Sequence, residues 1–188
     1  MSKYDHFNFL GPIYDFIFGK KKDDRIVALA DLKEDHNLLD IGGGTGRVTV
    51  LFGSISPNLF IVDSAKRMLI EAQKKGIIPV HSESERMPFQ SLAFDRIIMV
   101  DVLHHVRDQQ TTLNEMWRML KPGGKIVIEE PNIHHFFVKL IALGEKLLFM
   151  RSHFLPPEGI VELSQVDDDA LVEVVYGKGI VWVTIIKN

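Results

Sequence analysis

The sequence predicts an α/β protein built on a doubly wound, mostly parallel sheet of seven strands that closes with an antiparallel hairpin. From residue 37 onward, short apolar runs alternate with helix-like segments, which is the pattern of a parallel sheet covered by helices on both faces. The first run leads directly into a glycine-rich turn. The last two runs follow each other across a short glycine-containing turn, which indicates a hairpin rather than another crossover.

The apolar runs differ in how they connect to one another. The expected strands are 37–41, 59–63, 77–81, 94–100, 125–129, 170–176 and 180–187. The expected helices are 12–32, 46–54, 65–75 and 111–120. The last of these helices is expected to end at the sequence LKPGG, because proline and two glycines terminate a helix and turn the chain back towards a strand.

The segment 132–169 is the least regular part of the chain. It holds the apolar stretch 136–150, in which Phe136, Leu140, Leu143 and Leu147 share one helical face, and then the breaker LPPEG. Two interpretations stay open, a helix packed in the core or at a subunit interface, and a lid over an apolar substrate. The chain is therefore divided into a helical cap (1–35), a core (36–131), a lid or substrate segment (132–169) and a closing hairpin (170–188), all in one domain.

Composition excludes several classes of function. A chain of 188 residues fits one domain with a substantial core, and a net charge of −3 gives no electrostatic reason to expect nucleic-acid binding. The absence of cysteine rules out disulfides, thiolate zinc sites and a cysteine nucleophile, and it fits an intracellular protein. Charged residues interrupt the aromatic N-terminal stretch, so we expect no signal or transmembrane segment and a cytoplasmic location. We also expect a monomer or a homodimer.

The glycine-rich turn is the most informative motif. Asp40 lies near the end of the first strand, and glycines follow at Gly42, Gly43, Gly44 and Gly46. Glycine permits positive φ and removes the Cβ atoms that would hold a ligand away from the backbone. The expected helix behind the turn would offer free N–H groups to an electron-rich group. The turn therefore predicts a ligand site.

Two phosphate-binding alternatives fit this turn poorly. A dinucleotide fingerprint needs glycine at the first, third and sixth positions, but the sixth position counted from Gly42 is Arg47. A P-loop would continue with Gly-Lys-Ser or Gly-Lys-Thr, which does not follow. The carboxylate of Asp40 would also repel a pyrophosphate, whereas it suits a cationic or hydrogen-bond-donating ligand.

The sequence DIGGGTGR resembles the first motif of the class I S-adenosylmethionine-dependent methyltransferases, and four further segments match that family in order. These are IVDSAKRML, HSESERMPF, AFDRIIMVDVLHHV and MWRMLKPGGKIVIEEPN. The resemblance implies a Rossmann-like fold and S-adenosyl-L-methionine as cofactor. It assigns Asp63 to the two ribose hydroxyls, which a carboxylate can accept with its two oxygens, and Glu83 to the adenine side. The implied cofactor-binding residues are Tyr14, Asp40, Gly42, Gly43, Gly44, Gly46, Asp63, Ser64, Glu83, Ser84 and Asp101.

Several of these residues also have a purely structural interpretation. Asp63 could cap the helix that follows it, and Asp40 could hold the glycine turn in shape by accepting its amides. Glu83 and Glu85 could both be solvated, and only one of them is expected to contact the ligand. The aromatic residues around Tyr14 and Asp15 could simply pack together.

The implied reaction needs little acid–base machinery. The methyl group of S-adenosylmethionine is already electrophilic, so alignment of the acceptor is the main task, and it can lower a barrier by roughly 7 to 11 kcal/mol. If a proton must be removed, His104 and His105 after the fourth strand are the candidate catalytic bases. The structural alternative is that one of them caps backbone and the other packs inward. No metal is expected from these residues or from His134 and His135, since adjacent side chains diverge.

Within the family, the LHHV stretch and the closing hairpin resemble the branch of ubiquinone and menaquinone biosynthesis methyltransferases. The longer N-terminal pattern of the quinone enzymes is absent, so the acceptor is expected only to be small and fairly hydrophobic. Three alternatives stay open. They are a non-catalytic S-adenosylmethionine-binding protein, an NAD-dependent oxidoreductase, and a macromolecule methyltransferase, which is disfavoured by AspValLeuHis in place of an AsnProProTyr-type motif.

Overall fold

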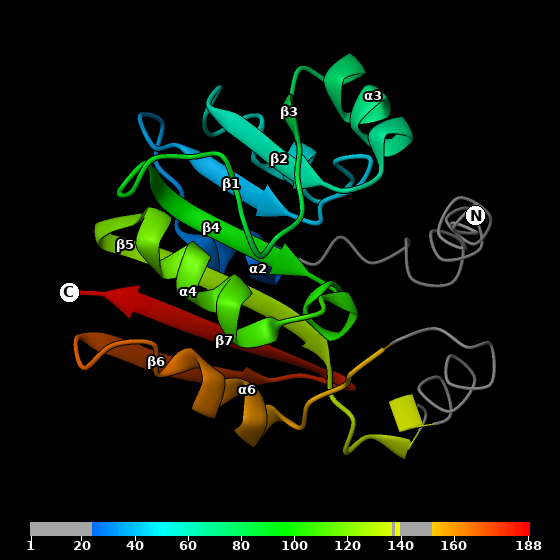
Figure 1. Ribbon diagram of the computed structural model, residues 1–188, viewed down its shortest axis with the longest axis vertical. Coiled ribbons are helices and arrows are strands. Elements are labelled where there is room, and N and C mark those ends of the chain that lie inside the picture. Colours follow the sequence, from blue (N-terminus) through cyan, green and yellow to red (C-terminus); the bar gives the residue numbers. More distant parts are fainter. Residues whose placement is uncertain (1–23, 137, 140–151) are drawn as a thin grey trace.

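The computed structural model describes residues 24–136, 138–139 and 152–188, and within them it confirms the predicted fold class. Seven strands form one sheet in the order β3-β2-β1-β4-β5-β7-β6 (Figure 1). The strands are β1 (Leu38–Ile41), β2 (Leu59–Asp63), β3 (Ile78–His81), β4 (Phe94–Val100), β5 (Leu120–Pro131), β6 (Ala170–Tyr176) and β7 (Ile180–Lys187). The pairings from β3 through β5 are parallel, whereas β7 is antiparallel to both β5 and β6.

Helices cover both faces of the sheet, as the alternating sequence predicts. The helices are α2 (Asp24–Ala30), α3 (Lys66–Lys74), α4 (Gln109–Met119) and α6 (Pro157–Ser164), with short 3₁₀ helices η1 (Thr49–Phe52) and η2 (Leu103–His105). Leu39 and Ile41 of β1 pack in the core layer that contains Met116 of α4 and Ile160 of α6. Leu38 points to the opposite layer, with α2, η1 and α3. This alternation places the intervening Asp40 on the same side as η1.

One helix prediction was wrong, and one helix was not predicted. The helix expected at 46–54 is the single 3₁₀ turn η1, in which the Leu51 amide bonds the Val48 carbonyl at 2.9 Å. Three adjacent β-branched residues from Val48 to Val50 disfavour a longer α-helix there. The unpredicted helix is α6, which begins inside the LPPEG segment with Pro157 in its first turn. Proline suits that position because the first helical N–H has no intrahelical partner.

The LKPGG segment turns the chain within β5 rather than before it. Phe94 pairs with Leu120 and Arg96 with Lys125, so the intervening residues bulge out of the ladder. Gly123 has φ of +74°, and a Cβ on Gly124 would lie 2.7 Å from the Lys121 carbonyl oxygen. Both glycines are therefore required by the turn, as the sequence indicated.

Several expectations concern residues that the structure does not describe. They are most of the N-terminal helix at 12–32, Tyr14 with Asp15, and most of the apolar stretch 136–150. The division of the chain at residues 36, 132 and 170 stays a prediction. In the described ranges, no helix is both long and apolar enough to cross a membrane.

Candidate cofactor and acceptor site

The glycine turn lies at the carboxyl end of β1, between the ends of β2 and β4. The Gly42 amide donates to the Val62 carbonyl at 2.7 Å, and Gly42, Gly44 and Gly46 have φ of +70°, +56° and +75°. A Cβ on Gly42 would lie 2.5 Å from the Val102 side chain, which follows β4. The turn is therefore packed against the neighbouring strand ends, where ligands bind in sheets of this class.

The four glycines serve different purposes. A Cβ on Gly43 would lie 2.5 Å from the Asp40 carboxyl carbon, and one on Gly46 would clash with Ile77. A Cβ on Gly44 would meet only the flexible end of Met68, at 3.1 Å, and Asp63 at 3.9 Å. Gly44 is thus the position where the backbone is most open to a ligand, whereas Gly43 and Gly46 are also required by packing.

Asp40 is buried beneath this turn, at 1% exposure. Its Oδ2 accepts a hydrogen bond from the Thr49 hydroxyl at 2.6 Å. Its Oδ1 is buried without a hydrogen-bond partner among the described residues. Burial raises the pKa of Asp40 to about 7, the Asp63 charge raises it further, and the Thr49 bond and Arg47 oppose the shift. The hydrogen bond that Asp40 accepts thus comes from Thr49, behind the turn, and none among the described residues comes from the glycine amides that the structural interpretation proposed.

Asp63 joins the glycine turn to the end of β2. Its Oδ2 accepts the Gly44 amide at 2.9 Å, and its Oδ1 accepts the Ala65 amide at 2.7 Å. A carboxylate oxygen has more than one acceptor site, so these bonds leave Asp63 able to accept ribose hydroxyls as well. Ser64 beside it is exposed, and its carbonyl contacts the His81 ring nitrogen at 3.0 Å.

The loop after β3 places its acidic residues in different surroundings. The Ser82 amide bonds the Asp63 carbonyl at 3.3 Å, so the loop starts beside the end of β2. Glu85 accepts the Arg107 amide at 3.0 Å, and Ser84 contacts the Thr112 hydroxyl at 3.2 Å, so both are tied towards α4. Glu83 is exposed. Of the two acids weighed for the adenine side, Glu83 is therefore the one whose carboxylate is open to a ligand.

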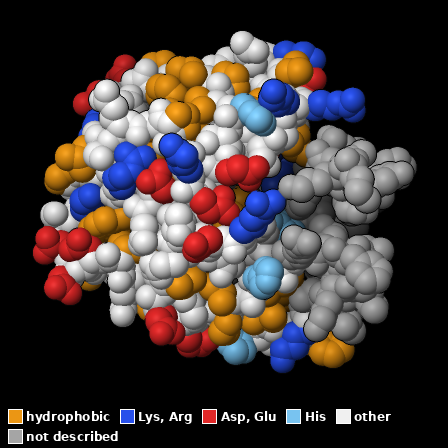
Figure 2. All heavy atoms as spheres, viewed as in Figure 1, with side chains coloured by type: hydrophobic (Ala, Val, Ile, Leu, Met, Phe, Trp, Pro, Cys, Tyr) orange, Lys and Arg blue, Asp and Glu red, His pale blue; other side chains and the backbone are white. Residues whose placement is uncertain are grey.

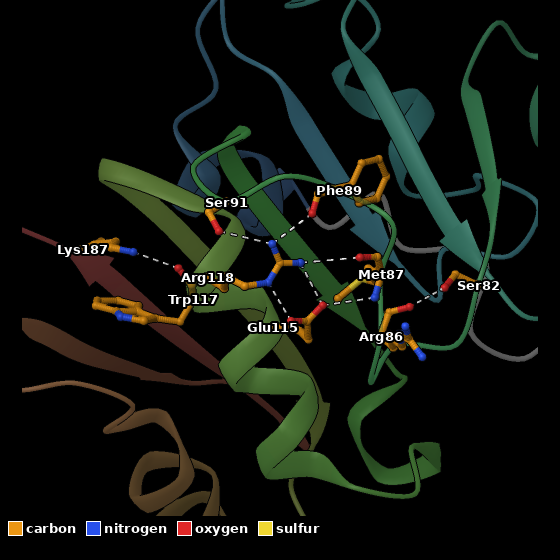
Figure 3. A network of polar contacts seen from close by, with 9 residues as sticks. All are labelled: Ser82, Arg86, Met87, Phe89, Ser91, Glu115, Trp117, Arg118 and Lys187. Carbon is orange, nitrogen blue, oxygen red and sulfur yellow. Dashed lines mark hydrogen bonds and ion pairs between the residues drawn. The ribbon is translucent and has the colours of Figure 1, made fainter.

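An ion-pair network fixes the remainder of this loop to α4 (Figure 3). Arg118 pairs with Glu115 at 2.7 Å and donates to the Phe89 carbonyl at 2.9 Å. Glu115 in turn accepts the Met87 amide at 3.1 Å. Hydrogen bonding to Arg118, opposed by burial, lowers the pKa of Glu115. The network holds the 87–91 backbone, and with it the shape of the loop that carries Glu83.

Replacing Arg118 by alanine is expected to lower the free energy of unfolding by about 1–2 kcal/mol, because the Phe89 carbonyl and the Glu115 carboxylate lose their partner. Amide exchange of residues 87–91 should accelerate. Urea unfolding and exchange mass spectrometry measure the two effects. Lys74→Ala is the matched control, since it breaks only an exposed ion pair with Glu71 and should change stability by less than about 0.5 kcal/mol. Equal exchange rates in the parent and the Arg118 variant would contradict this role.

The turn that follows β4 is held by Glu130, a residue that the sequence analysis did not single out. Asp101 has φ of +57°, a conformation that is uncommon for a residue with a side chain. Glu130, near the end of β5 and 3% exposed, accepts the amides of Val102 at 2.9 Å and Leu103 at 2.7 Å through Oε1. Only its place in IEEPN, near the end of the fifth strand, could have suggested it.

His104 and His105 lie in unequal positions. His104 is 1% exposed, contacts Glu130 Oε2 through Nδ1 at 2.5 Å, and stacks on Phe154 with ring centroids 4.3 Å apart. His105 is half-buried beside it, with Nδ1 3.4 Å from the Ser152 hydroxyl. Burial, with a smaller contribution from His104, lowers the pKa of His105 to about 3. His105 is therefore uncharged at neutral pH.

The other histidine pair lies near the start of α6. His134 contacts Glu158 at 3.1 Å on the surface, and His135 lies close to where a Gly179 Cβ would project. No group of three or more potential metal ligands occurs in the described ranges. The structure thus brings together Asp40, the glycines, Asp63 and the Asp101–Val102 turn, with Glu83 on the adjoining loop.

The sheet order, the glycine turn and the strand-end acid together define a Rossmann-like methyltransferase fold. A methyltransferase domain family matches residues 39–128, and the relatives and solved structures to which the chain is similar are methyltransferases. Similar relatives are ubiquinone/menaquinone biosynthesis C-methyltransferases UbiE. That of Pseudoalteromonas translucida is 30% identical over 55% of this chain and 46% of its own. That of Geotalea daltonii is 26% identical over 86% and 81%. The chain spans about half the length of most of the curated relatives it matches.

Solved structures share the fold at lower sequence identity. An S-adenosylmethionine-dependent methyltransferase from Thermotoga maritima is 20% identical, with a TM-score of 0.81 over 97% of both chains. The methyltransferase in a complex with the Trm112 methyltransferase activator of Haloferax volcanii is 15% identical. Its TM-score is also 0.81, over 98% of this chain and 99% of its own.

Proposed function

We propose that this protein binds S-adenosyl-L-methionine in the turn between β1, β2 and β4 and transfers its methyl group to a small acceptor. The observation that carries the proposal is the Asp63 carboxylate beside the Gly44 amide, at 2.9 Å. A carboxylate at this point suits a ribose diol and a cationic sulfonium, and it would repel a pyrophosphate. Arg47 at the sixth position of the turn argues in the same direction, against a dinucleotide.

The proposed reaction depends on alignment more than on a general base. His104 is buried against Glu130, and His105 is a weak base at neutral pH because its pKa is lowered to about 3. A base works best when its pKa lies near the working pH. We therefore favour an acceptor atom that is already nucleophilic, or one that loses its proton to water. The base role of either histidine stays a proposal.

The acceptor is proposed to be small and fairly hydrophobic. The names of the UbiE relatives place C-methylation in quinone biosynthesis among the reactions to test first. Acidic and basic side chains are interspersed on the face drawn in Figure 2, which gives no support to a nucleic-acid partner. A cytoplasmic location, a monomeric or homodimeric state and the substrate role of 132–169 also stay proposals.

Calorimetric titration tests the cofactor. S-adenosylmethionine and S-adenosylhomocysteine should both bind with micromolar affinity or better, about −8 kcal/mol, whereas NADH should not bind. Binding of NADH instead would establish the oxidoreductase alternative. Production of S-adenosylhomocysteine with a panel of phenolic and quinol acceptors would establish catalysis. Tight cofactor binding without turnover on any acceptor would favour the non-catalytic alternative.

A further inference from the structure

The loop between β4 and α4 depends on one buried carboxylate. Glu130 Oε1 accepts two successive amides, those of Val102 and Leu103, and Oε2 contacts Nδ1 of the next residue, His104. Three consecutive residues are therefore held from one side chain that belongs to a different strand. Because Glu130 is 3% exposed, water cannot replace these bonds without opening the structure.

The same loop contacts both sides of the candidate site. On the cofactor side, the Val102 side chain fills the space that a Cβ on Gly42 would need, so the loop and the glycine turn are in direct contact. On the other side, the His104 carbonyl accepts the His153 amide at 2.7 Å, and the His104 ring stacks on Phe154 with an interplanar angle of 14°.

Gln109 reinforces the second connection. Its side-chain amide donates to the carbonyls of Leu103 and His153, both at 2.9 Å. The residues just before α6 are thus fastened to the Glu130-held loop by hydrogen bonds and by ring stacking. They belong to the segment 132–169, for which a lid over the acceptor is one of the two interpretations that the sequence leaves open.

We propose that Glu130 is the positioning residue of this site, which sets the 102–104 loop against the glycine turn and through His104 holds the 152–155 segment in place. The inference rests on the proposed function for its effect on cofactor affinity. Its structural part does not depend on any ligand. Glu130 touches no reacting atom in this account and acts only through the residues that it binds.

Two substitutions distinguish the roles of the two carboxylate oxygens of Glu130. In Glu130→Gln the carboxamide oxygen can still accept both amides, but its NH₂ group would face His104 Nδ1, so the ring proton must move to Nε2. In Glu130→Ala both amides and the imidazole lose their partner. Asp95→Ala is the matched control, because Asp95 also accepts a backbone amide, that of Asn37 at 2.9 Å, at the opposite end of β4.

The first measurement is amide exchange in the ligand-free full-length chain, normalised to the slowest core amides. Glu130→Ala should accelerate exchange at Val102, Leu103 and His153 at least tenfold, whereas Glu130→Gln and Asp95→Ala should stay within threefold of the parent there. Nitrogen-detected NMR should find the His104 proton on Nδ1 in the parent and on Nε2 in Glu130→Gln. Unchanged exchange in Glu130→Ala, or the same His104 tautomer in both proteins, would overturn the proposal.

The second measurement is the affinity for S-adenosylhomocysteine. Glu130→Ala should raise its Kd at least tenfold and Glu130→Gln less than threefold. If Glu130→Gln and Glu130→Ala raise the Kd for S-adenosylhomocysteine by the same factor, the positioning role of Oε1 is overturned. If the parent itself fails to bind S-adenosylhomocysteine, the proposed function falls, while exchange in the ligand-free chain still decides the role of Glu130.

Discussion

Replacing Asp63 by alanine is expected to weaken S-adenosylmethionine binding by about 100-fold or more, roughly 2.7 kcal/mol. Two effects combine. The ribose hydroxyls would lose charge-assisted hydrogen bonds worth about 1.5–3 kcal/mol each, and the Gly44 and Ala65 amides would lose the acceptor that fixes the turn. Calorimetric titration measures the change. Glu71→Ala is the control, since it removes an exposed acid from α3 that pairs only with Lys74 among the described contacts.

A modified ligand separates the two effects of Asp63. Methylthioadenosine and its 2′-deoxy analogue differ only in one hydroxyl that the carboxylate is proposed to accept. The parent should prefer the hydroxylated ligand by about tenfold, as one hydrogen bond to a charged group predicts, and Asp63→Ala should bind both alike. If Asp63→Ala still prefers methylthioadenosine over the 2′-deoxy analogue, another residue binds this ribose hydroxyl. If it binds S-adenosylmethionine as the parent does, the site itself is misplaced.

The sequence predicted the sheet well because strand signals in this chain are local. The bounds of β2, β4, β6 and β7 agree with their apolar runs, and the turn residues between β6 and β7 specify the hairpin. The helix after the glycine turn was mispredicted for a local reason as well. Glycine and β-branched residues between 46 and 53 reduce it to one 3₁₀ turn, so propensity outweighed the family pattern there.

The parts of the site that the sequence could not give depend on long-range pairing. Asp63 meets Gly44 across 19 residues, and Glu130 meets His104 across 26. Family resemblance supplied Asp63, whereas no periodic pattern distinguishes Glu130, which turns to the β4 loop, from its neighbour Glu129, which bonds Trp182. Likewise, burial of His104 follows from its contacts with Glu130 and Phe154, and neither contact is visible in the sequence.

Asp40→Asn is expected to change the pH dependence of stability more than any other single substitution at this site. Burial raises the folded-state pKa of Asp40 from 3.8 to about 7, so the folded protein holds this proton more tightly than the unfolded chain does. The resulting stabilisation is complete below pH 3.8, declines as the pH rises towards 7, and is lost above it. At about 1.4 kcal/mol per unit, the loss is about 4 kcal/mol in all.

Asparagine at position 40 stays neutral and can still accept the Thr49 hydroxyl, so the variant should lack this decline. We expect the unfolding free energy of Asp40→Asn to rise relative to that of the parent by about 2–3 kcal/mol between pH 5 and pH 8. Urea unfolding at pH 5, 6, 7 and 8 measures the difference. If the unfolding free energies of the parent and the variant differ by the same amount at every pH, other groups stabilise the ionised Asp40 carboxylate. Asp40 would then not be the group that limits stability at high pH.

Asp95 provides a control of opposite sign at the other end of the sheet. Burial opposes its ionisation, but hydrogen bonds from Lys121 and the Asn37 amide outweigh burial and lower the pKa of Asp95. Its contribution to stability is therefore present at neutral pH and lost as the pH falls through the acidic range. Asp95→Asn should lose stability relative to the parent at pH 7, whereas Asp40→Asn should gain it. If Asp→Asn stabilises the protein at position 40 and destabilises it at position 95, burial alone does not explain the effect of Asp40. The ionised Asp40 carboxylate would then lower stability because it is buried without a charged partner such as Lys121.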